Sequence, residues 1–169
     1  AAEKFRARAL DSMQGEIICI GAAIADEGSF YKCTGGEREI LACFSDSLDY
    51  AIEAYHETPH FIGWNIVGFD IPFLWRKAIK YGLTGLRNAF NRDRYKGNIL
   101  DLMLAWGADW KDFRKQEDVA RFLEVPGECT KVTGATVYDA YLAGDMEGIV
   151  AHCKNDVETG RAIYRKIYE

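Results

Sequence analysis

An apolar segment that ends in polar residues constrains the fold of this chain more than any other feature. It begins at Phe61 and ends at Asp70, with Asn65 in its middle. Its first residues, 60–64, are short and apolar enough for a buried strand, and Pro72 suits the first turn of a helix. A carboxylate between a strand and a helix is fixed by the sheet yet open to solvent, so Asp70 is a candidate metal ligand.

A second acidic segment lies near the end of the chain, where apolar residues recur at helical spacing. His152 and Asp156 are four residues apart there, so a helix presents both on one face. Carboxylates from two distant segments, each beside a polar partner, suggest a divalent-metal site for phosphate chemistry. Simpler interpretations are open for both segments: Asp70 can cap the helix that follows it, and His152 with Asp156 can form an exposed surface pair.

Hydrophobic periodicity predicts an α/β domain. Strands are expected at residues 16–24, 29–33 and 60–64, with another short apolar element at 99–102. Helices are expected at residues 45–57, 72–81, 117–123, 137–142 and 145–169. Ser45 or Asp46 is expected to cap the first helix and Asp145 the last, while Gly82 closes the second and a loop follows it. This order of elements is typical of a mixed sheet flanked by helices.

Size and composition narrow the class of protein. A length of 169 residues, 49% of them hydrophobic, favours one globular domain with a sizeable core. No apolar run approaches the ~20 residues that a membrane span needs, so no membrane partner is expected. The cysteines are odd in number and have no CxxC spacing, which favours reduced thiols in the core and a cytoplasmic location. They are Cys19, Cys33, Cys43, Cys129 and Cys153.

Charge is distributed unevenly along the chain. The net charge of −5 argues against a protein that coats nucleic acid, but it leaves room for an enzyme that handles nucleic acid in a local groove. The stretch from Arg76 to Lys96 holds seven cationic residues and one acid, Asp93. It is either a local basic surface for nucleic acid or a solvated helix face followed by a polar loop.

The two acidic segments together resemble the motifs of a known enzyme superfamily. Asn65-x-x-x-Phe69-Asp70 resembles the second motif of the DEDD superfamily of 3′–5′ exonucleases, and the segment from His152 to Val157 resembles the third. The intervening sequence is similar to the branch related to the exonuclease domain of family B DNA polymerases, and the likeness covers nearly the whole chain. Further segments that carry it are residues 9–21, 99–103, 117–123 and 137–145.

The resemblance implies a ribonuclease H-like mixed sheet flanked by helices, in a single exonuclease-like domain over residues 1–169. It also implies hydrolysis of the terminal phosphodiester at the 3′ end of nucleic acid, with single-stranded DNA as the expected substrate and two Mg²⁺ or Mn²⁺ ions as cofactors. In the matched positions Asp70 and Asp156 bind metal, and His152 orients or deprotonates the attacking water. Asn65 then contacts a terminal sugar hydroxyl, and Phe69 contacts a base.

The chain departs from this pattern in two places. His152 stands where the branch usually has Tyr, although histidine can also act as a general base. The first motif, Asp-x-Glu on an opening strand, is absent, and the sequence predicts that it lies upstream of Ala1, in an N-terminally incomplete domain. The alternative is a catalytically inactive module that kept the exonuclease fold and binds nucleic acid or protein.

Overall fold

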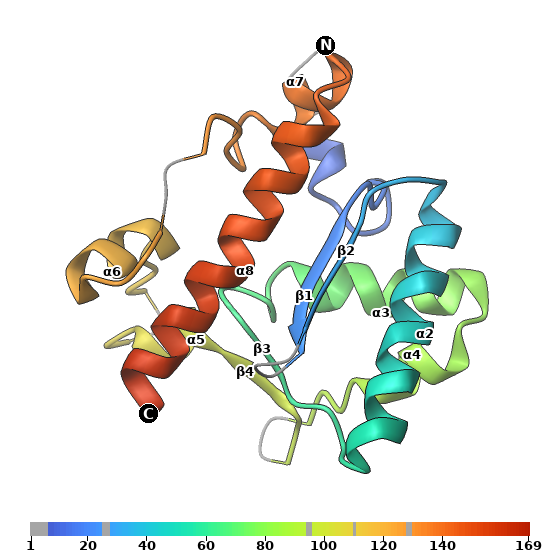
Figure 1. Cartoon of the computed structure of the whole chain (residues 1–169), viewed down its shortest axis with the longest axis horizontal. Helices are drawn as coiled ribbons and strands as arrows, with labels where there is room; N and C mark the ends of the chain where they lie inside the picture. Colours follow the sequence, from blue (N-terminus) through green and yellow to red (C-terminus); the bar gives the residue numbers. More distant parts are fainter. Residues whose placement is uncertain (1–6, 25–27, 94–95, 110, 128–129) are drawn as a thin grey trace.

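The computed structural model describes residues 7–24, 28–93, 96–109, 111–127 and 130–169 (Figure 1). Its strands are β1 (Ile20–Ile24), β2 (Gly28–Lys32), β3 (Phe61–Gly63) and β4 (Ile99–Asp101). Its helices are α2 (Glu37–Tyr55), α3 (Asp70–Tyr81), α4 (Thr84–Ala89), α5 (Leu102–Trp106), α6 (Gln116–Leu123), α7 (Val137–Leu142) and α8 (Met146–Tyr168). The α/β class predicted from the sequence is therefore confirmed. None of the described helices is long and apolar enough to cross a membrane.

The strands form two small sheets. β1 pairs antiparallel with β2, with Ile20 opposite Lys32, and β3 pairs in parallel with β4, with Phe61 opposite Ile99. Within the described residues no ladder joins the two sheets, so the prediction of one mixed sheet is not met there. One long edge of β1 and one of β3 consequently have no strand partner in the described part of the chain.

Two helices cover opposite faces of β1, so the hairpin lies between α8 and α2 in Figure 1. Successive residues of a strand point to opposite faces. Ile20 therefore packs with Leu41 of α2, while Gly21 faces α8. A Cβ atom at Gly21 would lie 2.6 Å from Cys153 Sγ, so only glycine lets α8 approach β1 this closely.

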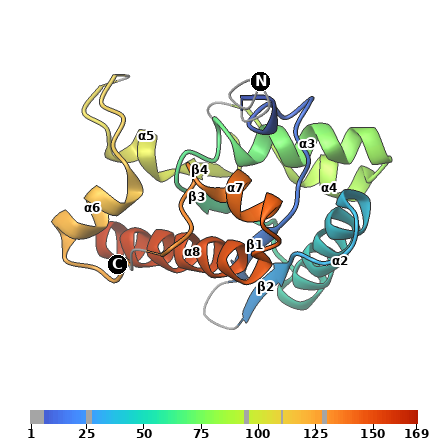
Figure 2. The same ribbon diagram turned by 90° about the horizontal axis from the view of Figure 1, so that it is seen from above.

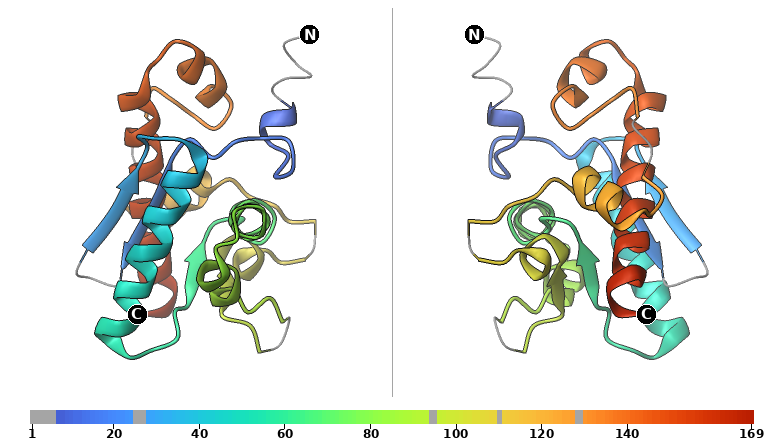
Figure 3. Two further views of the ribbon diagram at one scale, coloured as in Figure 1. Left: turned by 90° about the vertical axis from the view of Figure 1, so that its right-hand side faces the viewer. Right: turned by 90° about the vertical axis from the view of Figure 1, so that its left-hand side faces the viewer.

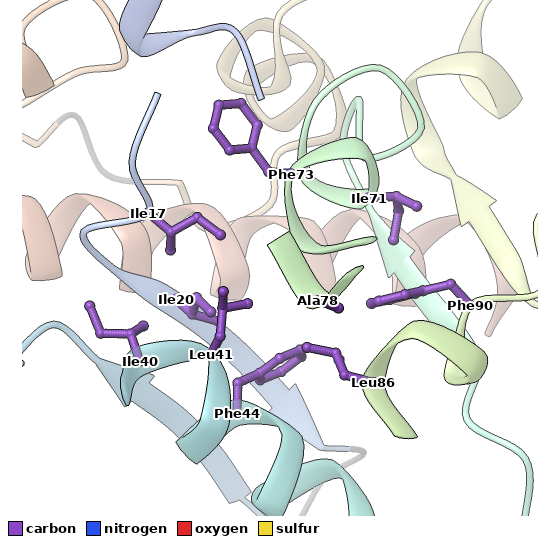
Figure 4. Packing of buried hydrophobic residues seen from close by; sticks show 10 residues of the cluster. All are labelled: Ile17, Ile20, Ile40, Leu41, Phe44, Ile71, Phe73, Ala78, Leu86 and Phe90. Carbon is purple, nitrogen blue, oxygen red and sulfur yellow. The ribbon is translucent and has the colours of Figure 1, made fainter. Parts of the chain in front are cut away.

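The main core lies between the β1–β2 hairpin, α2, α3 and α4. Figure 4 shows Ile17 and Leu41 beside Ile20, and Phe44 meeting Leu86 between α2 and α4. A second cluster of buried residues joins α5, α6 and the C-terminal part of α8, on the side of the molecule away from α2 (Figure 2). In this second cluster Ile163 of α8 packs near Val119 and Ala120, where α6 crosses α8 (Figure 3).

Several predicted element boundaries are wrong. α2 begins at Glu37, not at Ser45 or Asp46, because its apolar face already starts at Ile40; Ser45 is buried within the helix. Residues 16–19 do not belong to β1. The Ile17 N–H donates to Glu37 Oε1 at 2.9 Å instead of to a strand. The predicted loop after Gly82 contains the short helix α4.

Other local predictions are confirmed. Gly82 ends α3 in the left-handed conformation, with φ of 70°. Asp145 caps α8, and its carboxylate accepts the Gly148 N–H at 2.9 Å. The described cysteines are free thiols and only partly buried, which differs from the expected core positions; Cys129 lies outside the described residues.

The basic stretch from Arg76 to Lys96 is partly used inside the fold. Lys77 is buried, with Nζ 3.0 Å from Glu37 Oε1, and Lys80 lies 3.3 Å from the other oxygen of the same carboxylate. The Arg92 guanidinium lies 4.6 Å from the centre of the Trp75 ring. Burial removes Lys77 from the predicted basic surface, whereas Lys80 and Arg92 stay exposed; Arg94 lies outside the described residues.

Candidate functional site

Asp70 is the first residue of α3, directly after the turn that follows β3. Asn65 begins that turn in the left-handed conformation, with φ of 56°, which asparagine tolerates better than most residues. The Phe69 N–H donates to the Asn65 carbonyl at 3.0 Å and closes the turn. Phe69 is the N-cap residue and no side chain caps the helix, so the interpretation of Asp70 as a cap is wrong.

Asp101, at the end of β4, holds this turn in place. Its Oδ1 accepts the Asn65 N–H and its Oδ2 accepts the Val67 N–H, both at 3.0 Å. The same carboxylate caps α5 by accepting the N–H groups of Met103 and Leu104. Asp101 is buried, and parallel pairing puts the ends of β3 and β4 side by side. The sequence assigned it no role, although a single acid at the end of an apolar strand was a usable signal.

His152 and Asp156 lie on one face of α8, as the sequence predicts. His152 Nε2 is 3.4 Å from Asp156 Oδ2, and Nδ1 is 3.3 Å from Thr130 Oγ1. The Thr130 hydroxyl donates its only hydrogen to the Val132 carbonyl at 2.6 Å. The His152 ring therefore lies between Thr130 on its Nδ1 side and Asp156 on its Nε2 side.

The acidic side chains from the two segments lie within electrostatic range of each other. Crowding by protein atoms, followed by the nearby Asp156 and Asp101 carboxylates, raises the pKa of Asp70 to about 7. Asp70 nevertheless keeps accessible surface, so its carboxyl is crowded yet reachable from solvent. Desolvation also raises the pKa of Asp156, with Glu117 adding to the rise and His152 opposing it. Carboxylates that repel one another in this way are stabilised by a bound cation.

The two carboxylates are suitable ligands for a divalent cation, but two ligands are few. Mg²⁺ is commonly held by one or two carboxylates together with substrate phosphates, and Asp70 and Asp156 can supply these. No cluster of three or more ligating side chains occurs among the residues that the structure describes. Two other acids at the ends of this region do not add to the donor set. Asp145 caps α8, and Glu158 accepts a hydrogen bond from Arg161.

The two predicted substrate contacts lie on the same turn as Asp70. Asn65 Oδ1 occupies the space beside Gly68, where a Cβ atom would lie 2.6 Å from it. The Phe69 ring packs against Phe73, with ring centres 5.0 Å apart, and is 39% exposed. The turn therefore offers an aromatic surface next to the carboxylate, whereas the Asn65 oxygen points back over the turn.

Two thiols border the acidic residues. A hydrogen bond from Cys153 lowers the pKa of Cys19. The same bond, together with burial and the Asp156 and Asp70 carboxylates, raises the pKa of Cys153. The thiol pair therefore connects the segment before β1 to α8, one residue beyond His152.

In this α/β fold, acidic side chains from the turn after β3 and from α8 lie near each other. Enzyme sites that handle phosphate are built from acidic residues arranged in this way. Residues 17–168 match a family described as predicted 3′–5′ exonucleases related to the exonuclease domain of PolB. The chain belongs to this family, and the resemblance found in the sequence is confirmed. The family is one of nucleases, with nucleic acid as the class of substrate. Comparison with curated proteins and with solved structures gave no match.

Proposed function

We propose that this chain carries the active site of a 3′–5′ exonuclease that hydrolyses the terminal phosphodiester of single-stranded DNA with Mg²⁺ or Mn²⁺. One observation carries the proposal: Asp70 and Asp156, 86 positions apart in the sequence, lie close enough for the Asp156 carboxylate to contribute to the raised pKa of Asp70. Both occupy the positions that the family motifs give to metal ligands. The pair of ions, when bound, would polarise the phosphodiester and the attacking water.

The chain's own residues have separate roles in this proposal. Asp70 and Asp156 hold the cations and with them the scissile phosphate. The Thr130 contact fixes the His152 ring, so that Nε2 orients the attacking water or takes its proton. Asn65 contacts the terminal sugar and Phe69 a base, on the turn that Asp101 holds.

A further strand completes the proposed site. The open edges of β1 and β3 leave room in the hydrogen-bond pattern for a strand that pairs with both and makes one ribonuclease H-like mixed sheet. A strand with the Asp-x-Glu motif of the superfamily would raise the number of carboxylate ligands from two to four. With Asp70 and Asp156 alone we expect weak metal binding and slow cleavage.

A binding module without catalysis is the second candidate. The small donor set favours it, since no group of three ligating side chains forms among the described residues. Such a module binds nucleic acid equally well with and without Mn²⁺, whereas the exonuclease needs the ion for cleavage.

The decisive experiment follows nucleotide release from 3′-labelled single-stranded DNA in Mg²⁺, Mn²⁺ or EDTA. We expect slow, metal-dependent release that Asp70→Asn and Asp156→Asn each reduce by at least about 100-fold, given typical losses on removing charge stabilisation. The matched control is Asp46→Asn, an exposed residue of α2. Mn²⁺ binding by calorimetry gives a second measure, which the two site variants should weaken. Full release rates in both variants would contradict the assignment, and release in EDTA would contradict the metal dependence.

A further inference from the structure

Cys19 and Cys153 bring two distant parts of the chain into contact. Cys19 directly precedes β1, and Cys153 lies on the face of α8 that packs on this strand, 134 positions later in the sequence. The two thiols are joined by a hydrogen bond. Cys153 Sγ also occupies the space above Gly21, where a Cβ atom would lie only 2.6 Å from it. The packing of α8 on β1 therefore fixes Cys153 beside Cys19.

The two thiols are not equally ready to react. The thiolate is the form of cysteine that attacks a disulfide. Cys153 donates its hydrogen to Cys19, and this bond lowers the pKa of Cys19, which makes Cys19 the attacking sulfur. The bond is also the largest cause of the raised pKa of Cys153, and this cause ends once Cys19 has reacted. Both side chains are only partly buried, so a small oxidant can reach them.

A small-molecule disulfide is the oxidant that joins such a pair. The Cys19 thiolate attacks one sulfur of this disulfide, and the other sulfur leaves with the electron pair of the broken bond and takes up a proton. Cys153 then loses its proton and attacks the Cys19 sulfur of the mixed disulfide, which releases the second small thiol. Two protein thiols are thereby oxidised to one disulfide, and the oxidant is reduced to two thiols. An excess of small thiol reverses both steps.

The new bond would act on the part of α8 that carries the candidate site. Cys153 directly follows His152, and Asp156 lies about one turn further along the helix. A disulfide holds its sulfurs about 2 Å apart, closer than any hydrogen bond does. Its formation therefore pulls this part of α8 and the segment before β1 toward each other. A displacement of about 1 Å at a catalytic site can lower the rate by about 100-fold.

We infer that Cys19 and Cys153 form a redox switch, in which a small-molecule disulfide joins the two thiols and slows the neighbouring site, and a small thiol restores it. The formation of the bond depends on the contact between the thiols alone. The loss of activity rests on the proposed function. The inference gives a regulatory role to two residues that take no part in the proposed hydrolysis.

Peptide mapping tests the bond itself. The chain is equilibrated in mixtures of reduced and oxidised glutathione, its remaining thiols are blocked with iodoacetamide, and it is digested with trypsin without reduction. Cleavage after lysine and arginine leaves each of the five cysteines in a different peptide, so mass spectrometry identifies the partners directly. We expect a link between peptides 9–32 and 132–154, which hold Cys19 and Cys153, while Cys43 stays a blocked thiol.

Serine variants control this measurement. Cys19→Ser and Cys153→Ser should each remove the link, and Cys43→Ser, a change within α2, should leave it in place. Circular dichroism melts establish that each variant is folded. Thiols that stay blocked at both positions at every glutathione ratio would overturn the inference, and so would a link from either position to another cysteine.

Two further readouts connect the bond to the candidate site. Nucleotide release from 3′-labelled single-stranded DNA in Mn²⁺ should be about 10- to 100-fold slower for the oxidised chain, and reduction should restore it. Mn²⁺ binding, measured by calorimetry, should weaken on oxidation, because the bond displaces the turn of α8 that carries Asp156. Cys19→Ser should show the same release rate and the same Mn²⁺ affinity before and after treatment with the oxidant.

The outcomes separate this inference from the proposed function. A linked chain with the release rate and Mn²⁺ affinity of the reduced chain would overturn the switch and leave the exonuclease proposal standing. If neither the reduced nor the oxidised chain releases nucleotides, the exonuclease proposal fails. In that case the Mn²⁺ affinity decides the switch: a loss on oxidation supports it, and an unchanged affinity overturns it.

Discussion

Asp70 is the residue whose charge most directly links the fold to the proposed chemistry. Its carboxyl is crowded by protein atoms and faces the Asp156 and Asp101 carboxylates, so its pKa is raised to about 7. A proton relieves the repulsion in the metal-free chain, and a cation relieves it in the proposed enzyme. Proton and cation therefore compete for the same oxygen atoms, and the affinity for Mn²⁺ should increase with pH up to neutrality.

The stability of the metal-free chain should depend on pH through Asp70. The folded state holds the proton up to about pH 7, whereas the unfolded chain releases it near the ordinary aspartate pKa of 3.8. Between these values the folded state binds more protons, so its free energy of unfolding falls as pH rises. Asp70→Asn should flatten this fall, measured as urea midpoints in EDTA from pH 4 to pH 7. Equal slopes for the variant and the unmodified chain would show that Asp70 ionises normally.

At the scale of elements, Asp101 connects three of them. Its carboxylate ties the turn before α3 to the end of β4 and also caps α5. The position of Asp70 therefore depends on a side chain from a strand 31 positions later in the sequence.

Asp101→Asn tests this connection. The amide keeps the shape but replaces one acceptor oxygen with a donor, which leaves at least one backbone N–H of the turn without a partner. We expect a loss of about 1–3 kcal/mol in the free energy of unfolding, measured in urea. Asp46→Asn, on the exposed surface of α2, should change it by less than about 0.5 kcal/mol. A loss for Asp101→Asn no larger than this control would contradict the role of the carboxylate in the turn.

The sequence predicted correctly those helix ends at which a capping residue stands within one turn of the end. Gly82 ends α3 and Asp145 caps α8 because a left-handed glycine and an N-cap aspartate act within one helical turn. The start of α2 was missed because no side chain caps it; Gly36 precedes it, and Glu37 is fixed by Lys77 and by the Ile17 N–H. Contacts between distant residues of this kind leave no periodic signal in the sequence.

The candidate site, too, could be predicted from the sequence only in part. The spacing of His152 and Asp156 sets their contact, because a helix places residues four apart on one face. Thr130 and Asp101 could not be predicted as partners of the site, since only the tertiary fold brings them to His152 and to the turn. The sequence likewise does not distinguish Arg76 from its neighbour Lys77, which the fold buries.

At the scale of the whole molecule, two small sheets are held together mainly through helices. α8 contacts both β1 and β3, and α2 packs on the hairpin and on α3. The second cluster of buried residues includes Ile163 of α8, and the same helix contacts β1 of the first sheet. Within the described residues no strand pairing joins the two sheets directly.

The open strand edges also bear on how the isolated chain behaves in solution. β1 has the sequence Ile-Gly-Ala-Ala-Ile, without a charge or a proline to discourage pairing with another molecule. Residues 1–169 should therefore self-associate as concentration rises, measured by light scattering. Ile24→Lys, at the end of β1, should reduce this self-association, and Glu53→Lys, at an exposed position of α2, should not. A monomer at every concentration would mean that these edges are already protected.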